Sequence, residues 1–273
     1  PSGHSLVGLQ VYENGRAVDY LQSRPEVDGD RIGITGASGG GNQSMYAGAW
    51  DERFGAVVPV CSVGNYQSYL GAACCMCEVL PGALRFTEEG GVLGLVAPRG
   101  LLVINATEDA RQFSVTEAQK SIGAAQPIFD ALGRPTHLRH LPVESKHDYN
   151  QPMREAMYGW MTLHLKGEGN GDPIPEPALS TEDPEALRCF PGDTRPKDFK
   201  TLPKFAAEQG RRVSALQELP KTAAAWEEIR AARLEGLARC LAIEPVSPVV
   251  LEEDPLLPPG TLRFHPEPGI VLS

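Results

Sequence analysis

The feature that most constrains this chain is a short apolar run that stops at a cluster of glycines with one serine in its middle. Residues 32–42 read IGITGASGGGN. In a dinucleotide-binding loop such glycines let the backbone approach a pyrophosphate, and Ser38 has no role. In a Gly-x-Ser-x-Gly nucleophile elbow they make room for a strained strand-to-helix turn that exposes Ser38. Other parts of the sequence distinguish the dinucleotide-binding loop from the nucleophile elbow.

Several observations argue against the dinucleotide-binding loop. The third glycine position of that motif is Asn42, and the next expected strand ends in VCS, without an acidic residue to hold a ribose. The string TGASGG superficially resembles the short-chain dehydrogenases, but no tyrosine here is followed by lysine four positions later. We therefore favour the elbow, with Gly36 and Gly40 as the glycines that flank the serine.

Composition limits the partners of this chain. It has 273 residues, of which 41% are hydrophobic and 22% charged, as in globular proteins that bury a core. The net charge of −10 argues against nucleic acid and anionic membrane surfaces as partners. No apolar run reaches the roughly 18 residues that span a bilayer. We expect no nucleic-acid partner, no membrane partner and no cofactor.

A cluster of cysteines, Cys74-Cys75-Met76-Cys77, invites comparison with a metal site. Structural zinc sites space two ligands as Cys-x2–4-Cys and add a second pair further along the chain. Adjacent and one-apart cysteines cannot all reach one ion, and no second pair follows them. We expect no metal site here and interpret the thiols as small buried groups.

Expected strands and helices alternate over residues 1–166. Hydrophobic patterning predicts helices over 5–22, 42–50, 115–132 with a kink at Pro127, and 153–165, and an irregular stretch over 64–97. It predicts strands over 31–35, 56–60, 101–106 and 137–141. The third strand is a continuous apolar run of the kind that is buried on both faces of a parallel sheet. The alternation predicts an α/β fold with a parallel sheet and flanking helices.

The composition changes at Gly167. Residues 167–204 are rich in proline and predict an extended surface segment or linker. Residues 223–241 predict a helix with one apolar stripe, and the closing TLRFHPEPGIVLS is strand-like, as at the start of a second domain. Apolar residues over 205–273 are too sparse for a self-sufficient core, so we expect this helical tail to pack against another domain or chain.

Residues that could activate Ser38 follow it along the chain in a specific order. A serine nucleophile needs a base to take its proton and an acid to orient that base. Asp109 and His147 each follow an expected strand, which gives the order Ser, Asp, His that elbow-type nucleophiles require. The sequence therefore predicts a catalytic triad of Ser38, Asp109 and His147.

Each partner of Ser38 has an alternative. Glu108 competes with Asp109, and only one of two adjacent side chains after a strand can face the histidine. We favour Asp109 because enzymes with a nucleophile elbow place the acid three residues after a small residue, here Ala106. His137 and His140 are expected inside a strand, where a core or surface role is usual. His164 is expected late in a helix, as a surface or capping residue.

Four stretches carry a family resemblance: GASGGGNQS, DERFGAVVPVCSV, LVAPRGLLVINATED and KHDYNQPMREAMYGW. Together they are similar to the acetylxylan-esterase-like and dienelactone-hydrolase-like α/β hydrolases over residues 3–166. The resemblance implies the same triad and a Gly39 amide that donates to the oxyanion. It also implies that Gly40 and Gly41 allow close substrate approach, and that Asn42 and Gln43 open the helix after the elbow. The expected substrate is a carboxylic ester, for example an acetyl ester of a carbohydrate.

The stretch 64–97, which would form part of the substrate pocket in that family, departs from it through the Cys-Cys-Met-Cys run. Two other functions therefore stay open. One is a catalytically silent hydrolase-like scaffold protein. The other is a serine peptidase of the prolyl-oligopeptidase type, although those enzymes usually carry an aromatic residue where this chain has Gly39.

The position of the elbow strand predicts an incomplete sheet. An α/β hydrolase usually places several strands before the nucleophile strand and takes one oxyanion amide from a loop near the third of them. Here one expected helix precedes strand 31–35, which suggests the C-terminal half of the sheet. We expect the missing strands to come from another polypeptide or from an N-terminal part outside this sequence, because an exposed apolar edge invites aggregation.

Overall fold

The computed structural model describes residues 4–72, 79–215, 219–241, 251–253, 258, 261–267 and 270–272. It divides into two compact units, Pro1–Ala207 and Glu208–Ser273, and the first contains the parallel sheet. The α-helices of the first unit are α1 (Leu6–Gln22), α2 (Gly39–Trp50), α3 (Tyr66–Ala72), α4 (Glu89–Gly94), α5 (Val115–Ala131), α6 (Gln151–Met161) and the start of α7 (Leu202–Ala215). Its short turns are η2 (Ala83–Arg85), η3 (Arg111–Phe113), η4 (Pro135–His137), η5 (Thr162–Lys166, a π-helix) and η6 (Pro191–Asp193).

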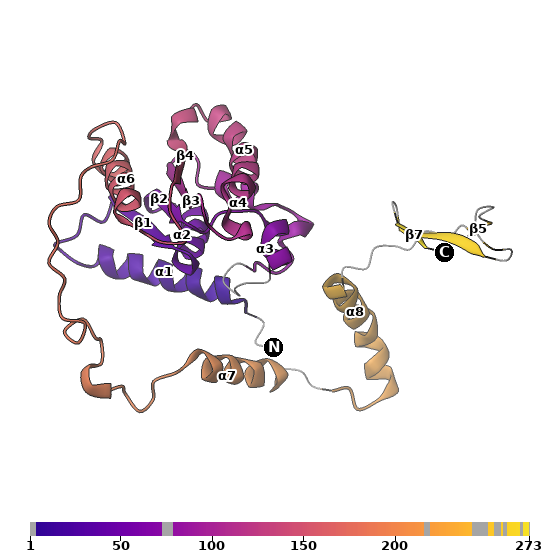
Figure 1. Ribbon diagram of the computed structural model, residues 1–273. Helices are drawn as coiled ribbons and strands as arrows, with labels where there is room; N and C mark the ends of the chain where they lie inside the picture. The colour runs from indigo at the N-terminus through magenta and orange to yellow at the C-terminus, as the bar shows by residue number, and fades with distance from the viewer. Residues whose placement is uncertain are drawn as a thin grey trace. The chain divides into compact units, whose positions relative to one another are not determined.

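Four parallel strands form the sheet in the order β1-β2-β3-β4 (Figure 1). They are β1 (Ile32–Ala37), β2 (Phe54–Val60), β3 (Gly100–Ala106) and β4 (Leu138–Val143). All four expected strands are present within two residues of their expected bounds, which confirms the α/β class and the parallel sheet. Because the strands are parallel, the residues that follow each of them gather at one edge of the sheet.

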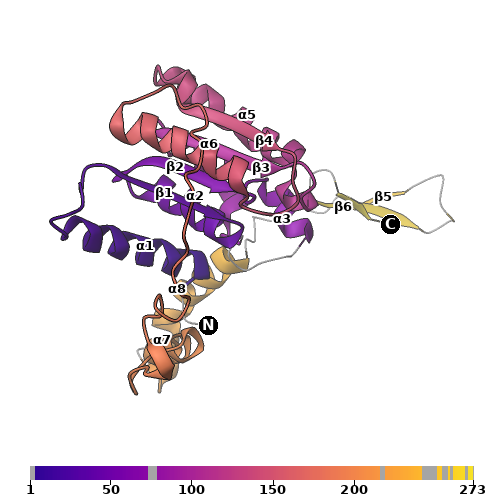
Figure 2. The ribbon, with the colours of Figure 1, turned by 60° about the vertical axis from the view of Figure 1, so that its left-hand side comes forward.

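Helices cover both faces of this sheet. On one face, residues from α1, α2, α4 and α5 pack with Ile32, Val57, Leu101 and Val103. On the other face, Met153, Ala156 and Trp160 of α6 pack against Ala56, Val58, Leu102 and Ile104. Figure 2 shows α6 running along the sheet. The alternate residues of β2 and β3 thus face opposite helix layers, which explains why these strands are apolar throughout.

Side-chain caps set the starts of several helices. The hydroxyl of Ser5 accepts a hydrogen bond from Gly8 at 3.1 Å, and that of Ser114 accepts one from Glu117. The side chain of Asn150 accepts from Met153 and begins α6. Such caps satisfy backbone donors that the helix itself cannot. Within α5, the helix continues through Pro127.

Two parts of the helix prediction were wrong. Residues 64–97 are not irregular throughout, since they contain α3, η2 and α4. The helix after the elbow begins at Gly39, three residues before the expected start at Asn42, because the Ser38 carbonyl accepts the hydrogen bond from the Asn42 amide at 3.0 Å.

The proline-rich segment after Gly167 runs extended along α6. The amide of Ile174 donates to the carbonyl of Glu155 at 3.0 Å. Arg154 binds Glu176 at 2.6 Å, and this pairing lowers the pKa of Glu176 to about 2. The part of the segment up to Glu176 is therefore docked on the sheet-bearing unit.

Within the described residues, β1 pairs with β2 on one side and with no strand on the other. The expectation that further strands complete the sheet from elsewhere stays a prediction. No described helix combines the length and the apolar character that a membrane crossing requires.

The second unit holds the rest of α7, the helix α8 (Ala223–Leu241) and a three-stranded antiparallel sheet. Its strands are β5 (Leu251–Glu253), β6 (Leu262–Glu267) and β7 (Ile270–Leu272). Among the described residues, neither α7 nor α8 has a buried side chain, and the α8 stripe residues Leu234, Leu237 and Leu241 are exposed. That this tail docks on another domain or chain stays a prediction.

Candidate active site

Ser38 sits in a strained turn between β1 and α2. Its backbone has φ 56° and ψ −122°, a conformation that L-residues rarely adopt and that costs about 1–3 kcal/mol. Its amide donates to the carbonyl of Val60 at 2.9 Å, which ties the turn to the end of β2. Gly39 is the first residue of α2, so its amide has no acceptor inside the helix. These are the local features expected of a nucleophile elbow.

The glycines of this turn are needed to different degrees. A Cβ atom on Gly36 would lie 2.5 Å from the backbone carbon and oxygen of Gly40, and one on Gly41 would collide with Ser62. A Cβ atom on Gly40 would meet nothing within 4 Å. The turn therefore requires glycine at positions 36 and 41, whereas position 40 faces open space.

Asp109 and His147 meet beyond the ends of β3 and β4. Both carboxylate oxygens of Asp109 lie 2.9 Å from Nδ1 of His147. The Asp109 side chain is 1% exposed and the His147 side chain 42% exposed. The His147 ring stacks on Phe113, with the ring centres 5.8 Å apart. A buried carboxylate thus fixes one ring nitrogen, while much of the imidazole faces solvent.

The alternatives to Asp109 and His147 make other contacts. Glu108 is exposed, and its amide donates to the carbonyl of Ser145 at 3.0 Å. His140 is on β4, as expected, and binds the side chain of Asn105 at 3.0 Å. His137 precedes β4 in η4, so its expected place inside the strand was wrong.

His164 is a second correction, because it is neither a surface nor a capping residue. It packs against Trp160, with ring centres 4.3 Å apart, and against His137 at 4.8 Å. Burial, with the nearby charges of His137 and Arg139, lowers the pKa of His164 to about 4. The half-buried ring is therefore neutral at neutral pH.

Cys61 is a neighbour of the site that the sequence analysis did not single out. It is buried directly after β2, has φ 47°, and its thiol donates to the carbonyl of Asp148 at 3.3 Å. Burial raises the pKa of the Cys61 thiol, and the charge of Asp109 adds to this effect. The thiol stays protonated at neutral pH and does not compete with Ser38 as a nucleophile.

A second unexpected contact holds the loop of His147. The Thr35 hydroxyl on β1 donates to the carbonyl of Val58 at 2.8 Å, and the Tyr149 hydroxyl lies 2.7 Å from the same Thr35 oxygen. Because Thr35 uses its proton on Val58, Tyr149 is the donor in the second bond. The contact joins β1, the strand before Ser38, to the loop two residues beyond His147.

The sequence around the elbow is similar to that of known proteins. The sequence model of the prolyl oligopeptidase family matches residues 11–74, which run from α1 past Ser38 and Cys61. The protein YtaP of Bacillus subtilis (strain 168) is 39% identical over 61 residues, which cover 22% of this chain and 20% of YtaP. The 4-O-methyl-glucuronoyl methylesterase 1 of Sodiomyces alcalophilus is 29% identical over 162 residues, which cover 48% of this chain and 32% of that protein.

Solved structures share the arrangement of the sheet-bearing unit. A carbohydrate esterase family 15 glucuronoyl esterase from Caldicellulosiruptor kristjansonii aligns with a TM-score of 0.53 and 17% identity, over 66% of this chain and 55% of the esterase. Methylesterase BT1017 aligns with a TM-score of 0.57 and 22% identity, over 78% of this chain and 49% of its own. The chain has the α/β-hydrolase fold. It spans about half the length of these two structures and less of its curated relatives.

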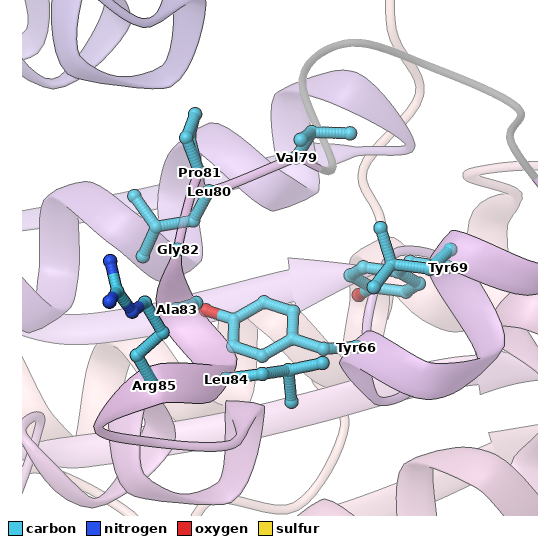
Figure 3. A pocket seen from close by; sticks show the side chains of 10 residues that line it. Tyr66, Tyr69, Val79, Leu80, Pro81, Gly82, Ala83, Leu84 and Arg85 are labelled. Atoms are coloured by element: carbon cyan, nitrogen blue, oxygen red, sulfur yellow. The ribbon is translucent and has the colours of Figure 1, made fainter. Parts of the chain in front are cut away.

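A pocket of about 230 Å³ lies beside α3, and the described residues that line it fall between Tyr66 and Arg85. Figure 3 shows the Tyr66 ring of α3 extending toward the turn that carries Ala83 and Leu84. The ring of Tyr69 lies 5.8 Å from that of Phe113, which itself stacks on His147. The pocket is thus two aromatic contacts from His147.

Sequence reasoning missed Cys61, Tyr149 and Thr35. Cys61 carried a usable signal, since it follows the end of β2 as Asp109 follows the end of β3, and ligands of open parallel sheets bind at that edge. The Thr35–Tyr149 contact carried none, because 114 residues separate the two. The run Cys74-Cys75-Met76-Cys77 lies outside the described residues.

Proposed function

We propose that this hydrolase domain is a serine esterase with Ser38 as nucleophile, His147 as general base and Asp109 as the residue that orients the base. The observations that carry the proposal are the pair of 2.9 Å contacts between Asp109 and Nδ1 of His147 and the strained turn of Ser38 at the end of β1. A carboxylate bound to Nδ1 leaves Nε2 as the ring nitrogen that accepts the serine proton.

In the proposed mechanism, His147 takes the proton of the Ser38 hydroxyl as the oxygen attacks the ester carbonyl. The carbonyl oxygen becomes negatively charged, and the Gly39 amide donates to it. The carbon–oxygen bond to the alcohol then breaks, and His147 gives its proton to the leaving alcohol. Water, deprotonated by His147, releases the acid from Ser38. Asp109 stabilises the positive imidazolium in both halves of the reaction.

We further propose carbohydrate esters as the substrate class. Two proteins similar to this chain are named for glucuronoyl esters, and a third is named a methylesterase. The resemblance read from the sequence suggests acetyl esters of carbohydrates instead. In a glucuronoyl ester the sugar is the acid, and in an acetyl ester it is the alcohol. The two substrates therefore place the sugar on opposite sides of Ser38.

A serine peptidase is the second candidate. The match of the prolyl oligopeptidase family model to residues 11–74 favours it, because those residues contain the elbow. The same triad would serve both reactions, since esters and amides are cleaved through the same acyl-enzyme. Only the leaving group separates the two functions.

A substrate panel on the full-length protein tests these proposals. It contains p-nitrophenyl acetate, acetylated xylan, a methyl ester of glucuronic acid and dipeptide p-nitroanilides. Wild type is expected to hydrolyse esters faster than anilides, and Ser38→Ala to lose roughly 10⁴-fold or more of kcat. Ser180→Ala, which changes an exposed serine, is the matched control and should match wild type.

Other results of the substrate panel would support a different function. Cleavage of the anilides alone would favour the peptidase. Absence of all turnover, together with no labelling by a fluorophosphonate probe, would indicate a catalytically silent scaffold. Turnover that survives in purified Ser38→Ala would contradict the proposed nucleophile.

A further inference from the structure

Cys61 occupies the same place on β2 that Ser38 occupies on β1. Ala37 and Val60 are paired in the parallel register, so Ser38 and Cys61 are the next residue on each of two neighbouring strands. They are also the two non-glycine residues with positive φ in the described part of the chain, at 56° and 47°. Since backbone strain of this kind concentrates at functional sites, the position of Cys61 calls for an explanation.

The environment of Cys61 supplies one. Cys61, Asp109 and His147 each offer one ligand atom, and these three atoms lie within 4.8 Å of one another. The sulfur and the carboxylate are buried, whereas the imidazole is open to solvent. The three groups offer one sulfur, one oxygen and one nitrogen ligand, and they follow three successive strands of the sheet.

We propose that Cys61, Asp109 and His147 form a binding site for Zn²⁺ and that the bound ion inhibits the hydrolase. Zinc binds thiolate, imidazole and carboxylate, so its binding releases the proton of the Cys61 thiol to solvent. Three protein ligands with an open fourth position are a common set. The thiolate favours zinc over the hard cations Mg²⁺ and Ca²⁺, which prefer oxygen ligands. The ion acts as an inhibitor here and not as a cofactor.

The geometry needs a small movement to hold the ion. Bonds of about 2.0–2.3 Å in a tetrahedral site place ligand atoms roughly 3.3–3.8 Å apart, which is closer than the 4.8 Å that bounds this group and wider than the 2.9 Å between Asp109 and Nδ1 of His147. The exposed ring of His147 can turn by this amount, whereas the buried Cys61 and Asp109 are fixed by packing. The ion enters from the solvent side of His147.

Inhibition follows from the groups that the ion occupies. Zinc on Nδ1 leaves the neutral ring with its proton on Nε2, so Nε2, the nitrogen proposed to accept the serine proton, has no free lone pair. An Asp109 carboxylate bound to zinc also no longer orients the ring. Without this base, Ser38 keeps its proton and attacks slowly. This second part of the inference rests on the proposed triad, but the binding of the ion does not.

Cobalt spectroscopy tests the site directly on the full-length protein. Co²⁺ replaces Zn²⁺ in such sites and gives a thiolate-to-metal absorption band only when sulfur is a ligand. Wild type and the control Cys189→Ser, which changes an exposed cysteine, are expected to show the band. Cys61→Ser and Cys61→Ala are expected to lose it, with circular dichroism to verify that both are folded.

Competition with Zn²⁺ then gives affinities. Cys61→Ser and His147→Gln are each expected to weaken Zn²⁺ binding by about 10-fold or more. A thiolate band or a Zn²⁺ affinity that is unchanged in Cys61→Ser would overturn the site and assign the metal to other cysteines. An unchanged affinity in His147→Gln would also overturn it.

An activity assay separates the site from the proposed function. With an active esterase, Zn²⁺ should inhibit wild type reversibly, with release by a chelator, and the inhibition constant should rise about 10-fold or more in Cys61→Ser. Inhibition that is equal in Cys61→Ser would overturn the inhibitory role. If wild type has no esterase activity yet shows the Cys61-dependent cobalt band, the proposed function fails and the metal site stands.

Discussion

Asp109 and His147 are 38 residues apart in the chain, yet both carboxylate oxygens of Asp109 lie 2.9 Å from Nδ1 of His147. The contact exists because β3 and β4 are parallel neighbours, so the residues after both strands reach the same edge of the sheet. The buried carboxylate can hold one tautomer of the imidazole and stabilise its protonated form.

Loss of this carboxylate should impair catalysis without unfolding the domain. In Asp109→Asn the side-chain amide no longer fixes the tautomer, and kcat should fall by about 10³–10⁴-fold. Glu108→Gln is the matched control, since it alters the adjacent exposed carboxylate, and it should stay within about twofold of wild type. Steady-state kinetics on an ester substrate measure both. A larger loss in Glu108→Gln than in Asp109→Asn would contradict the assignment of the acid.

The hydrogen bond from Tyr149 to Thr35 should position the loop that carries His147. Tyr149→Phe removes the hydroxyl and keeps the ring, so kcat should fall several-fold to tens of fold while KM changes little. Tyr158→Phe is the matched control, because it removes a hydroxyl that binds Glu176 at 2.8 Å on the outer side of α6. Equal kinetics of the two variants would mean that Tyr149 has only a structural role.

The arrangement of the sheet could be predicted from the sequence, because its signals are local. Four apolar runs mark the strands, and glycine clusters and polar residues mark their ends. The order Ser38, Asp109, His147 follows from the same signals. Because the sheet is parallel, the three loops are expected at one edge of it, and this expectation needs no knowledge of side-chain contacts.

Side-chain surroundings could not be predicted, because distant segments decide them. His164 looked like a surface residue, and it is half-buried because Trp160 and His137 of the η4 turn pack against its ring. Tyr149 depends on Thr35, which belongs to the first strand. The helices α3 and α4 are short and interrupted by glycines, so their periodicity is too weak to detect in the sequence.

Substitution of the elbow glycines should lower stability at position 36 and not at position 40. In Gly36→Ala the new Cβ would lie 2.5 Å from backbone atoms of Gly40, so the turn must open, at a cost of about 1–3 kcal/mol or more. Gly40→Ala is the matched control, because its Cβ meets nothing within 4 Å and alanine favours the helix. Urea unfolding should show a lower midpoint for Gly36→Ala alone. A Gly40→Ala variant that is equally destabilised would contradict this geometry of the turn.

The half-buried His164 should make the domain sensitive to acid. Burial lowers its pKa to about 4, whereas an unfolded histidine titrates near 6.5. Between these values the unfolded state binds the additional proton, so the contribution to stability is full above about pH 6.5 and is lost as the pH falls toward 4. Its loss over this range should amount to about 2 kcal/mol, after allowance for partial exposure.

Urea unfolding at pH 7 and pH 5 measures this dependence. His164→Gln should flatten the pH dependence of the free energy of unfolding, while the exposed His4→Gln should leave it as in wild type. An equal dependence in His164→Gln and wild type would show that other groups cause the acid sensitivity.

The most direct test of Ser38 as the nucleophile is the mass of the full-length protein after reaction with a p-nitrophenyl phosphonate ester. The reagent phosphonylates an activated serine and releases nitrophenol, which can be counted. We expect one phosphonyl group from this reagent per protein, located by peptide sequencing on Ser38. We expect no group from it and no nitrophenol release in Ser38→Ala or in wild type whose serine a fluorophosphonate has already blocked. A wild-type protein that stays unmodified, or an adduct that persists in Ser38→Ala, would contradict the account.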